Sequence, residues 1–151
     1  TPLNYRFIPI IKIAFPDSII IHCTRDAKSN LFSCFENFWD SPYLNFTCRQ
    51  DVLNNYFRRY RALLNVYDLS FPEAIHGFSL DNLINNGIDE LTSVFNHLNI
   101  PFREEYLDFY KNNRSISSAS MLQVRQPIFS KTSDRYKVHQ KSLGHLFNDL
   151  P

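Results

Sequence analysis

Residues 19–26 constrain the fold of this chain more than any other segment. They read Ile-Ile-Ile-His-Cys-Thr-Arg-Asp, an apolar, β-branched run that ends at an Arg-Asp pair. An amphipathic segment follows at once, with Leu31 and Phe35 on one side. This order predicts a buried strand over residues 18–23, a tight turn, and a helix over residues 26–39. Ligands of open α/β sheets bind at the carboxyl edge of the strands, so Arg25 stands at a candidate site.

A serine, Ser33, follows Arg25 by eight residues and falls within the predicted helix. An arginine fork and a hydroxyl group together suit a phosphate. The residues also fit a simpler interpretation, in which Arg25 and Asp26 form an ion pair at the strand end. Asp26 would then cap the helix, and Ser33 would be an ordinary helix serine. The local pattern alone leaves both interpretations open.

The rest of the chain alternates helical patterns with one further short strand, predicted over residues 74–78. Helices are predicted over residues 4–14, 88–98, 102–110 and 134–150, loops over residues 40–45 and 112–131, and a long helix around residues 50–64. Thr47 and Gln50 have the spacing of a capping box for that long helix. Two strands are too few for a finished sheet. We therefore expect one incomplete α/β domain over residues 1–151, helix-rich, with a partial parallel sheet and an upstream part that supplies further strands.

Composition and charge exclude several classes of protein. Hydrophobic residues make up 44% of the chain and charged residues 21%, as in soluble globular domains. A net charge of +1 argues against nucleic-acid and membrane-surface binding. Three cysteines without paired spacing favour a reducing, cytoplasmic setting in which all three are packed or half-buried. His22 and His76 lie in strand-like runs and are interpreted as satisfied core or sheet histidines, and no metal is expected.

Four stretches, taken in order, resemble sulfotransferases that use 3′-phosphoadenosine 5′-phosphosulfate (PAPS). The branch that they resemble is bacterial, associated with tetratricopeptide repeats and similar to protein-tyrosine sulfotransferases. The stretches are residues 1–8 (TPLNYRFI), 20–35 (IIHCTRD through SCF), 88–102 (a helix that ends in LNIPF) and 118–129 (SASMLQVRQPIF). The first is similar to the segment of the family that reads Lys-x-Pro-x-Asn, without its Lys.

This resemblance implies a fold related to P-loop kinases and transfer of a sulfuryl group from PAPS to a hydroxyl or amine. It implies that Arg25 and Ser33 bind the 3′-phosphate and that Arg125 reaches the same group from a late loop. Residues 115–124 would fold over the nucleotide. No catalytic residue can be carried over, because the glycine-rich loop and the catalytic base have no counterpart in this sequence. We therefore expect the chain alone to be inactive.

Departures from the family pattern favour a second hypothesis. Ala27 and Ser29 stand where the family has Pro and Asp, Leu80 replaces a tyrosine that contacts adenine, and Asp134 and Tyr136 replace Gly and Trp. The alternative is a non-catalytic α/β binding or assembly module with a degenerate nucleotide site. A weaker third option is another P-loop-related transferase or kinase. The expected partners are the nucleotide co-substrate, an acceptor that the sequence does not identify, and further copies of the chain through exposed surfaces.

Overall fold

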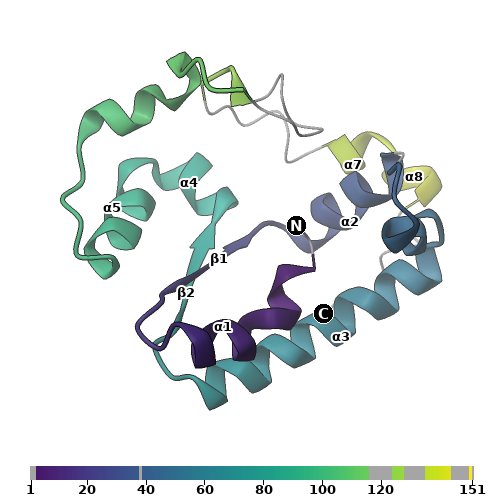
Figure 1. Cartoon of the computed structure of the whole chain (residues 1–151). Helices are drawn as coiled ribbons and strands as arrows, with labels where there is room; N and C mark the ends of the chain where they lie inside the picture. The colour runs from purple at the N-terminus through teal and green to yellow at the C-terminus, as the bar shows by residue number, and fades with distance from the viewer. Residues whose placement is uncertain (1–2, 38, 116–123, 128–134, 144–149, 151) are drawn as a thin grey trace.

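The computed structural model describes residues 3–37, 39–115, 124–127, 135–143 and 150. Strands β1 (Ile20–Thr24) and β2 (Ile75–Ser79) pair in parallel near the centre of the described chain, with helices around them (Figure 1). Thr24 lies opposite Ser79 at the carboxyl ends of the strands. This confirms the predicted mixed fold with a small parallel sheet, and both strands lie within two residues of their predicted positions.

The chain enters β1 from a helical segment. A 3-10 turn, η1 (Asn4–Phe7), runs directly into helix α1 (Ile8–Ala14). Pro9 lies in the first turn of α1, where a missing backbone N–H group leaves no hydrogen bond unmade. The Lys12 ammonium then donates to the Ser18 carbonyl at 2.7 Å and closes the turn that leads to β1. The helix predicted over residues 4–14 is confirmed.

Helix α2 (Ala27–Glu36) begins immediately after the turn at Arg25. The Asp26 side chain is its cap, because Asp26 Oδ1 accepts hydrogen bonds from the Ser29 backbone N–H at 2.8 Å and the Ser29 hydroxyl at 2.7 Å. Ser29 is buried, with 4% of its surface exposed. The cap therefore fixes the direction in which α2 leaves the sheet.

Helix α2 ends three residues earlier than predicted, because two side chains bond to carbonyl groups of its last turns. The Asn37 amide donates to the Ser33 carbonyl at 2.6 Å, and the Trp39 indole donates to the Cys34 carbonyl at 3.0 Å. These bonds satisfy carbonyl groups that a longer helix would have paired internally.

The capping box predicted at Thr47 and Gln50 is wrong. A 3-10 turn, η2 (Pro42–Cys48), occupies part of the predicted loop, and the Thr47 hydroxyl donates to the Leu44 carbonyl inside it at 2.9 Å. Thr47 is only 3% exposed, so its hydroxyl is not available to the next helix. Helix α3 (Gln50–Ser70) begins after Arg49 without a side-chain cap.

A helix that the sequence analysis missed follows β2. Helix α4 (Leu80–Asn86) is capped by Ser79, whose hydroxyl accepts from the Asn82 backbone N–H at 3.2 Å. Its only buried side chain is Leu83, so it leaves little apolar periodicity to detect. Gly87, with φ of 56°, separates α4 from helix α5 (Ile88–His97), where a helix was predicted.

The described C-terminal part is less regular than predicted. A 3-10 segment, η3 (Glu104–Lys111), stands where a short helix was expected. Two short helices, α7 (Arg135–Val138) and α8 (Gln140–Leu143), replace the described part of the single closing helix. The remainder of that helix, at residues 144–149, lies outside the described residues. So do the predicted loop positions 116–123 and 128–131.

Two apolar clusters bind the helices together. Leu31 and Phe32 of α2 meet Leu53 of α3, while Ile8 of α1 meets Leu64 and Tyr67 further along α3. Leu53 is the most deeply buried large side chain described, at 2% exposure. Helix α3 is therefore the scaffold on which both α1 and α2 rest (Figure 1).

The cysteines correct one expectation. All three are free thiols, and Cys34 is half-buried, but Cys23 and Cys48 are exposed. Cys48 is the last residue of η2, at the surface, and Cys23 faces the pocket described below. Among the described helices, none is both long and apolar enough to cross a lipid bilayer.

Candidate functional site

Arg25 occupies the predicted place at the carboxyl edge of the sheet. It follows the last residue of β1 and directly precedes Asp26, the cap of α2. Its side chain is half-buried. The Thr24 hydroxyl donates to the Phe78 carbonyl at 3.4 Å and links the two strand ends at this point. Arg25 thus projects from a turn that is held on both sides by regular structure.

Two carboxylates that the sequence analysis missed secure this edge. The Asp26 backbone N–H donates to Asp81 Oδ2 at 2.6 Å, and the Ser79 backbone N–H donates to Glu90 Oε1 at 2.6 Å. Asp81 lies in the first turn of α4 and Glu90 in the first turn of α5. The acidic residue Asp81, just after β2, was the available signal, but its partner lies 55 positions away in the chain.

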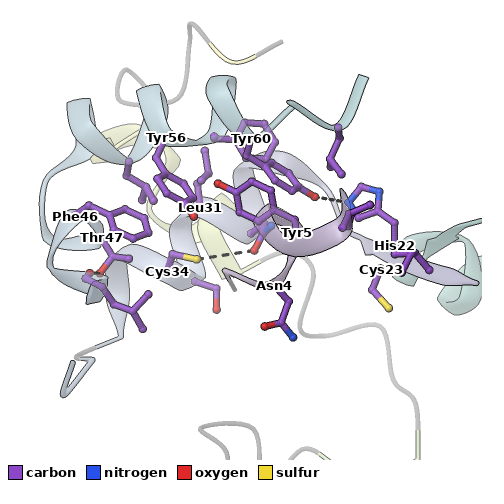
Figure 2. A pocket seen from close by; sticks show the side chains of 18 of the residues that line it. Asn4, Tyr5, His22, Cys23, Leu31, Cys34, Phe46, Thr47, Tyr56 and Tyr60 are labelled. Atoms are coloured by element: carbon purple, nitrogen blue, oxygen red, sulfur yellow. Dashed lines mark hydrogen bonds between the residues drawn. The ribbon is translucent and has the colours of Figure 1, made fainter. Parts of the chain in front are cut away.

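A pocket of about 710 Å³ runs along the other side of β1. All of residues 19–23 contribute to its wall. Successive side chains of a strand point to opposite faces of a sheet, so a pocket that reaches four consecutive residues of β1 follows the strand edge. This is the edge of β1 that does not pair with β2. The other walls come from η1, α1, α2, η2 and α3 (Figure 2).

The polar centre of this pocket is His22, which forms a short hydrogen bond through Nε2 with the Tyr60 hydroxyl of α3 (Figure 2). The Tyr5 ring meets the Tyr60 ring edge-on, with centroids 5.0 Å apart. The interpretation of His22 as a satisfied sheet histidine is therefore confirmed. Burial, and secondarily the positive charge of Arg61, lower the pKa of His22, and burial raises the pKa of Tyr60.

Tyr56 extends the aromatic wall toward η2. Its ring stacks on Phe46 with centroids 4.1 Å apart, and the Arg6 guanidinium lies 5.6 Å from its centroid. Burial, followed by the neighbouring Tyr5 hydroxyl, raises the pKa of Tyr56 to about 12. The phenol is therefore neutral at physiological pH, and the wall combines apolar surface with neutral hydroxyl groups.

The three predicted binding residues differ in what surrounds them. Ser33 lies on α2 and lines the pocket, and the structure records no hydrogen bond from its hydroxyl to another described residue. Arg25 directly precedes the cap of the same helix and is not among the residues that line the pocket. Arg125 donates to the Arg114 carbonyl, which ties it to the segment after η3 rather than to β1 or α2. Most of the loop predicted to cover the nucleotide lies outside the described residues.

His22 leads to a prediction about stability and pH. Because the pKa of His22 is lowered in the folded chain, the unfolded chain takes up its proton first as pH falls. The free energy of unfolding should therefore decrease below pH 6.5, the ordinary pKa of histidine, and continue to decrease down to the lowered pKa. Urea unfolding across this range should show a smaller decrease for His22→Gln than for the unsubstituted chain.

His139→Gln is the control, since His139 is exposed and stacks only on Phe32, with centroids 5.4 Å apart. It should keep the pH dependence of the unsubstituted chain. If His22→Gln kept that dependence too, the burial assigned to His22 would be wrong.

Within the described residues, no group of three or more His, Cys, Asp or Glu side chains is placed to hold a metal ion. The strand edge presents the Arg25 guanidinium, and the pocket presents the Ser33 and tyrosine hydroxyl groups and the His22 imidazole. Such groups hold an anionic or hydrogen-bonding ligand directly.

Comparison with known proteins gives an independent view of the chain. A family model described as the sulfotransferase family matches residues 1–104. An uncharacterized protein of Aquifex aeolicus (strain VF5) is 20% identical over 144 residues, covering 94% of this chain and 19% of that protein. The chain therefore spans about a fifth of the length of this curated relative. No solved structure shows a significant match.

Proposed function

Because the chain belongs to the sulfotransferase family, we propose that the intact protein transfers a sulfuryl group from PAPS to a hydroxyl or amine acceptor. The observation that carries this proposal is the position of Arg25. It is a half-buried arginine at the carboxyl end of a parallel strand, within the segment that the family model matches. Anionic ligands of parallel sheets are held at such an edge.

In this proposal Arg25 and Ser33 hold the 3′-phosphate of the donor. The Arg25 guanidinium can donate two parallel hydrogen bonds to phosphate oxygens, and the Ser33 hydroxyl can donate one. The backbone N–H of Ser29 is already engaged by the Asp26 carboxylate at 2.8 Å. This part of the chain therefore offers the phosphate side chains rather than a row of backbone N–H groups, and the phosphosulfate would be held by groups outside this sequence.

Three finer assignments belong to the same proposal. Arg125 would join the 3′-phosphate site when the donor is bound, moving from its present contact with the Arg114 carbonyl. The four stretches at residues 1–8, 20–35, 88–102 and 118–129 together support placement in the bacterial branch similar to protein-tyrosine sulfotransferases. Three free thiols, two of them exposed, support a reducing cytoplasmic setting.

The experiment that tests the function is a pair of titrations with the intact protein. Calorimetry should show 3′,5′-adenosine diphosphate binding more tightly than adenosine 5′-phosphate, and labelled sulfate should pass from PAPS to some member of a phenol, sugar and peptide panel. Binding without transfer would favour the alternative, a non-catalytic module with a degenerate site. Leu80 is the residue that favours this alternative. Equal affinity for the two nucleotides would reject the 3′-phosphate site.

We also propose that the isolated chain self-associates through the free edge of β1. Residues 19–23 carry no Lys, Arg, Asp or Glu, so identical edges can meet without charge repulsion. Exposed apolar side chains nearby, including Ile13 at 80% and Phe15 at 67%, would also be covered in a pair. Light scattering at micromolar concentration should report a dimer or a larger species.

Ile21→Lys should shift this species toward monomer, because a charge on a strand edge opposes pairing. Val138→Lys, on an exposed site of α7, is the control and should leave the assembly unchanged. An unsubstituted chain that remains monomeric at micromolar concentration would contradict the proposal.

A further inference from the structure

The Asp81 carboxylate contacts the peptide bond that follows Arg25. Its Oδ2 atom accepts a hydrogen bond from the Asp26 backbone N–H at 2.6 Å, and it comes from α4, 55 positions later in the chain. The register of the sheet brings Asp26 and Asp81 together, because Thr24 and Ser79 lie opposite each other and a helix follows each strand directly.

The hydrogen bond acts on the conformation of Arg25 itself. The Asp26 N–H and the Arg25 carbonyl belong to one rigid peptide plane. Asp81 fixes the orientation of this plane, while Oδ1 of Asp26 fixes the next turn by capping α2. The two anchors together leave the backbone at Arg25 little freedom, and they set the direction in which its Cα–Cβ bond points.

We infer that Asp81 is a positioning residue, which aims the Arg25 guanidinium at the 3′-phosphate without contacting the nucleotide. This inference rests on the proposed function. An unanchored backbone at Arg25 would lose conformational entropy when the arginine binds the phosphate, and the Asp81 hydrogen bond removes part of that loss in advance. Asp81 therefore favours binding of the 3′-phosphate, although its carboxylate carries the same sign of charge as the phosphate.

That conflict of signs makes the inference testable. If Asp81 acted only through its charge, removing it would strengthen the binding of a phosphate, because one repulsion would disappear. If Asp81 positions Arg25, removing it weakens binding despite the lost repulsion. Asparagine separates the two effects, since its amide oxygen still accepts a hydrogen bond from the Asp26 N–H but carries no charge.

The experiment is calorimetry on the intact protein, with 3′-phosphate selectivity as the readout. Selectivity is the ratio of the Kd for adenosine 5′-phosphate to the Kd for 3′,5′-adenosine diphosphate. Asp81→Ala should lower this ratio by about 10-fold, because the backbone at Arg25 would then be ordered only on binding, at a cost in conformational entropy. Asp81→Asn should retain it. Asp89→Ala, an acid in the first turn of α5, removes the same charge and should change nothing.

Amide hydrogen exchange gives a second readout, since Asp81→Ala should speed exchange at the Asp26 N–H and Asp81→Asn should not. If Asp81→Ala fails to fold, Asp81→Glu displaces the acceptor by one methylene group and should lower selectivity several-fold. Unchanged selectivity in the Ala or Glu variants, or tighter phosphate binding in both Ala and Asn, overturns the positioning role alone. An unsubstituted protein without selectivity overturns the proposed function, and the positioning role with it.

Discussion

Replacing Arg25 with alanine is expected to weaken binding of 3′,5′-adenosine diphosphate to the intact protein by about 30-fold or more. Loss of a charge-assisted, partly buried contact costs roughly 2–5 kcal/mol. Binding of adenosine 5′-phosphate should change far less, because Arg25 is proposed to contact only the 3′-phosphate. The substituted residue stands at the end of β1, outside both apolar clusters, so the fold should persist.

Ser33→Ala tests the second proposed ligand of the same phosphate. It should act in the same direction as Arg25→Ala but less strongly. One neutral donor contributes about 0.5–1.5 kcal/mol, and up to about 3 kcal/mol when it bonds to a charged group. Its hydroxyl has no recorded partner among the described residues, so the substitution leaves no other group unpaired there.

Lys28→Ala is the matched control for charge. Lys28 lies in the first turn of α2, close to Arg25 in sequence, but the family resemblance gives it no role. It should leave the ratio of the two affinities unchanged. Calorimetry on the three variants measures the affinity of each for 3′,5′-adenosine diphosphate and for adenosine 5′-phosphate. Equal losses for both nucleotides, or no loss at Arg25, would mean that Arg25 and Asp26 have only a structural part at the strand end.

The parts of the fold that could be predicted are those with dense local signals. The β-branched run before His22 allows little other than a strand, and the apolar stripe from Leu53 to Leu64 allows little other than a helix. Arg25 could be placed at the strand edge because the strand, turn and helix are adjacent in sequence. Each of these inferences uses residues from one short, continuous segment of the chain.

The parts that could not be predicted depend on distant partners or on competing local bonds. Thr47 has the spacing of a cap, but a nearer carbonyl at Leu44 engages its hydroxyl first. The hydrogen bond from the Asp26 N–H to Asp81 joins residues 55 positions apart, and only the strand register brings them together. Cys23 is exposed because it faces an open pocket, which the composition of its strand does not reveal.

The contact between α2 and α3 holds the helix that carries Ser33, and Leu53 lies at the centre of this contact. Leu53 is 2% exposed and packs against Leu31 and Phe32 of α2. Leu53→Ala should lower the free energy of unfolding by about 2–5 kcal/mol, because it removes buried methyl groups and leaves a cavity. Urea denaturation followed by circular dichroism measures this loss.

Leu69→Ala is the matched control, since Leu69 lies on the same helix but is 83% exposed. Its effect should stay within about 0.5 kcal/mol. The comparison also bears on binding, because Leu53 holds the helix that carries Ser33, and both residues line the pocket. In the folded Leu53→Ala protein, α2 can shift toward the cavity, so affinity for the 3′-phosphate should fall while the contribution of Arg25 remains. A Leu53→Ala protein as stable as the control would show that α2 is held mainly from elsewhere.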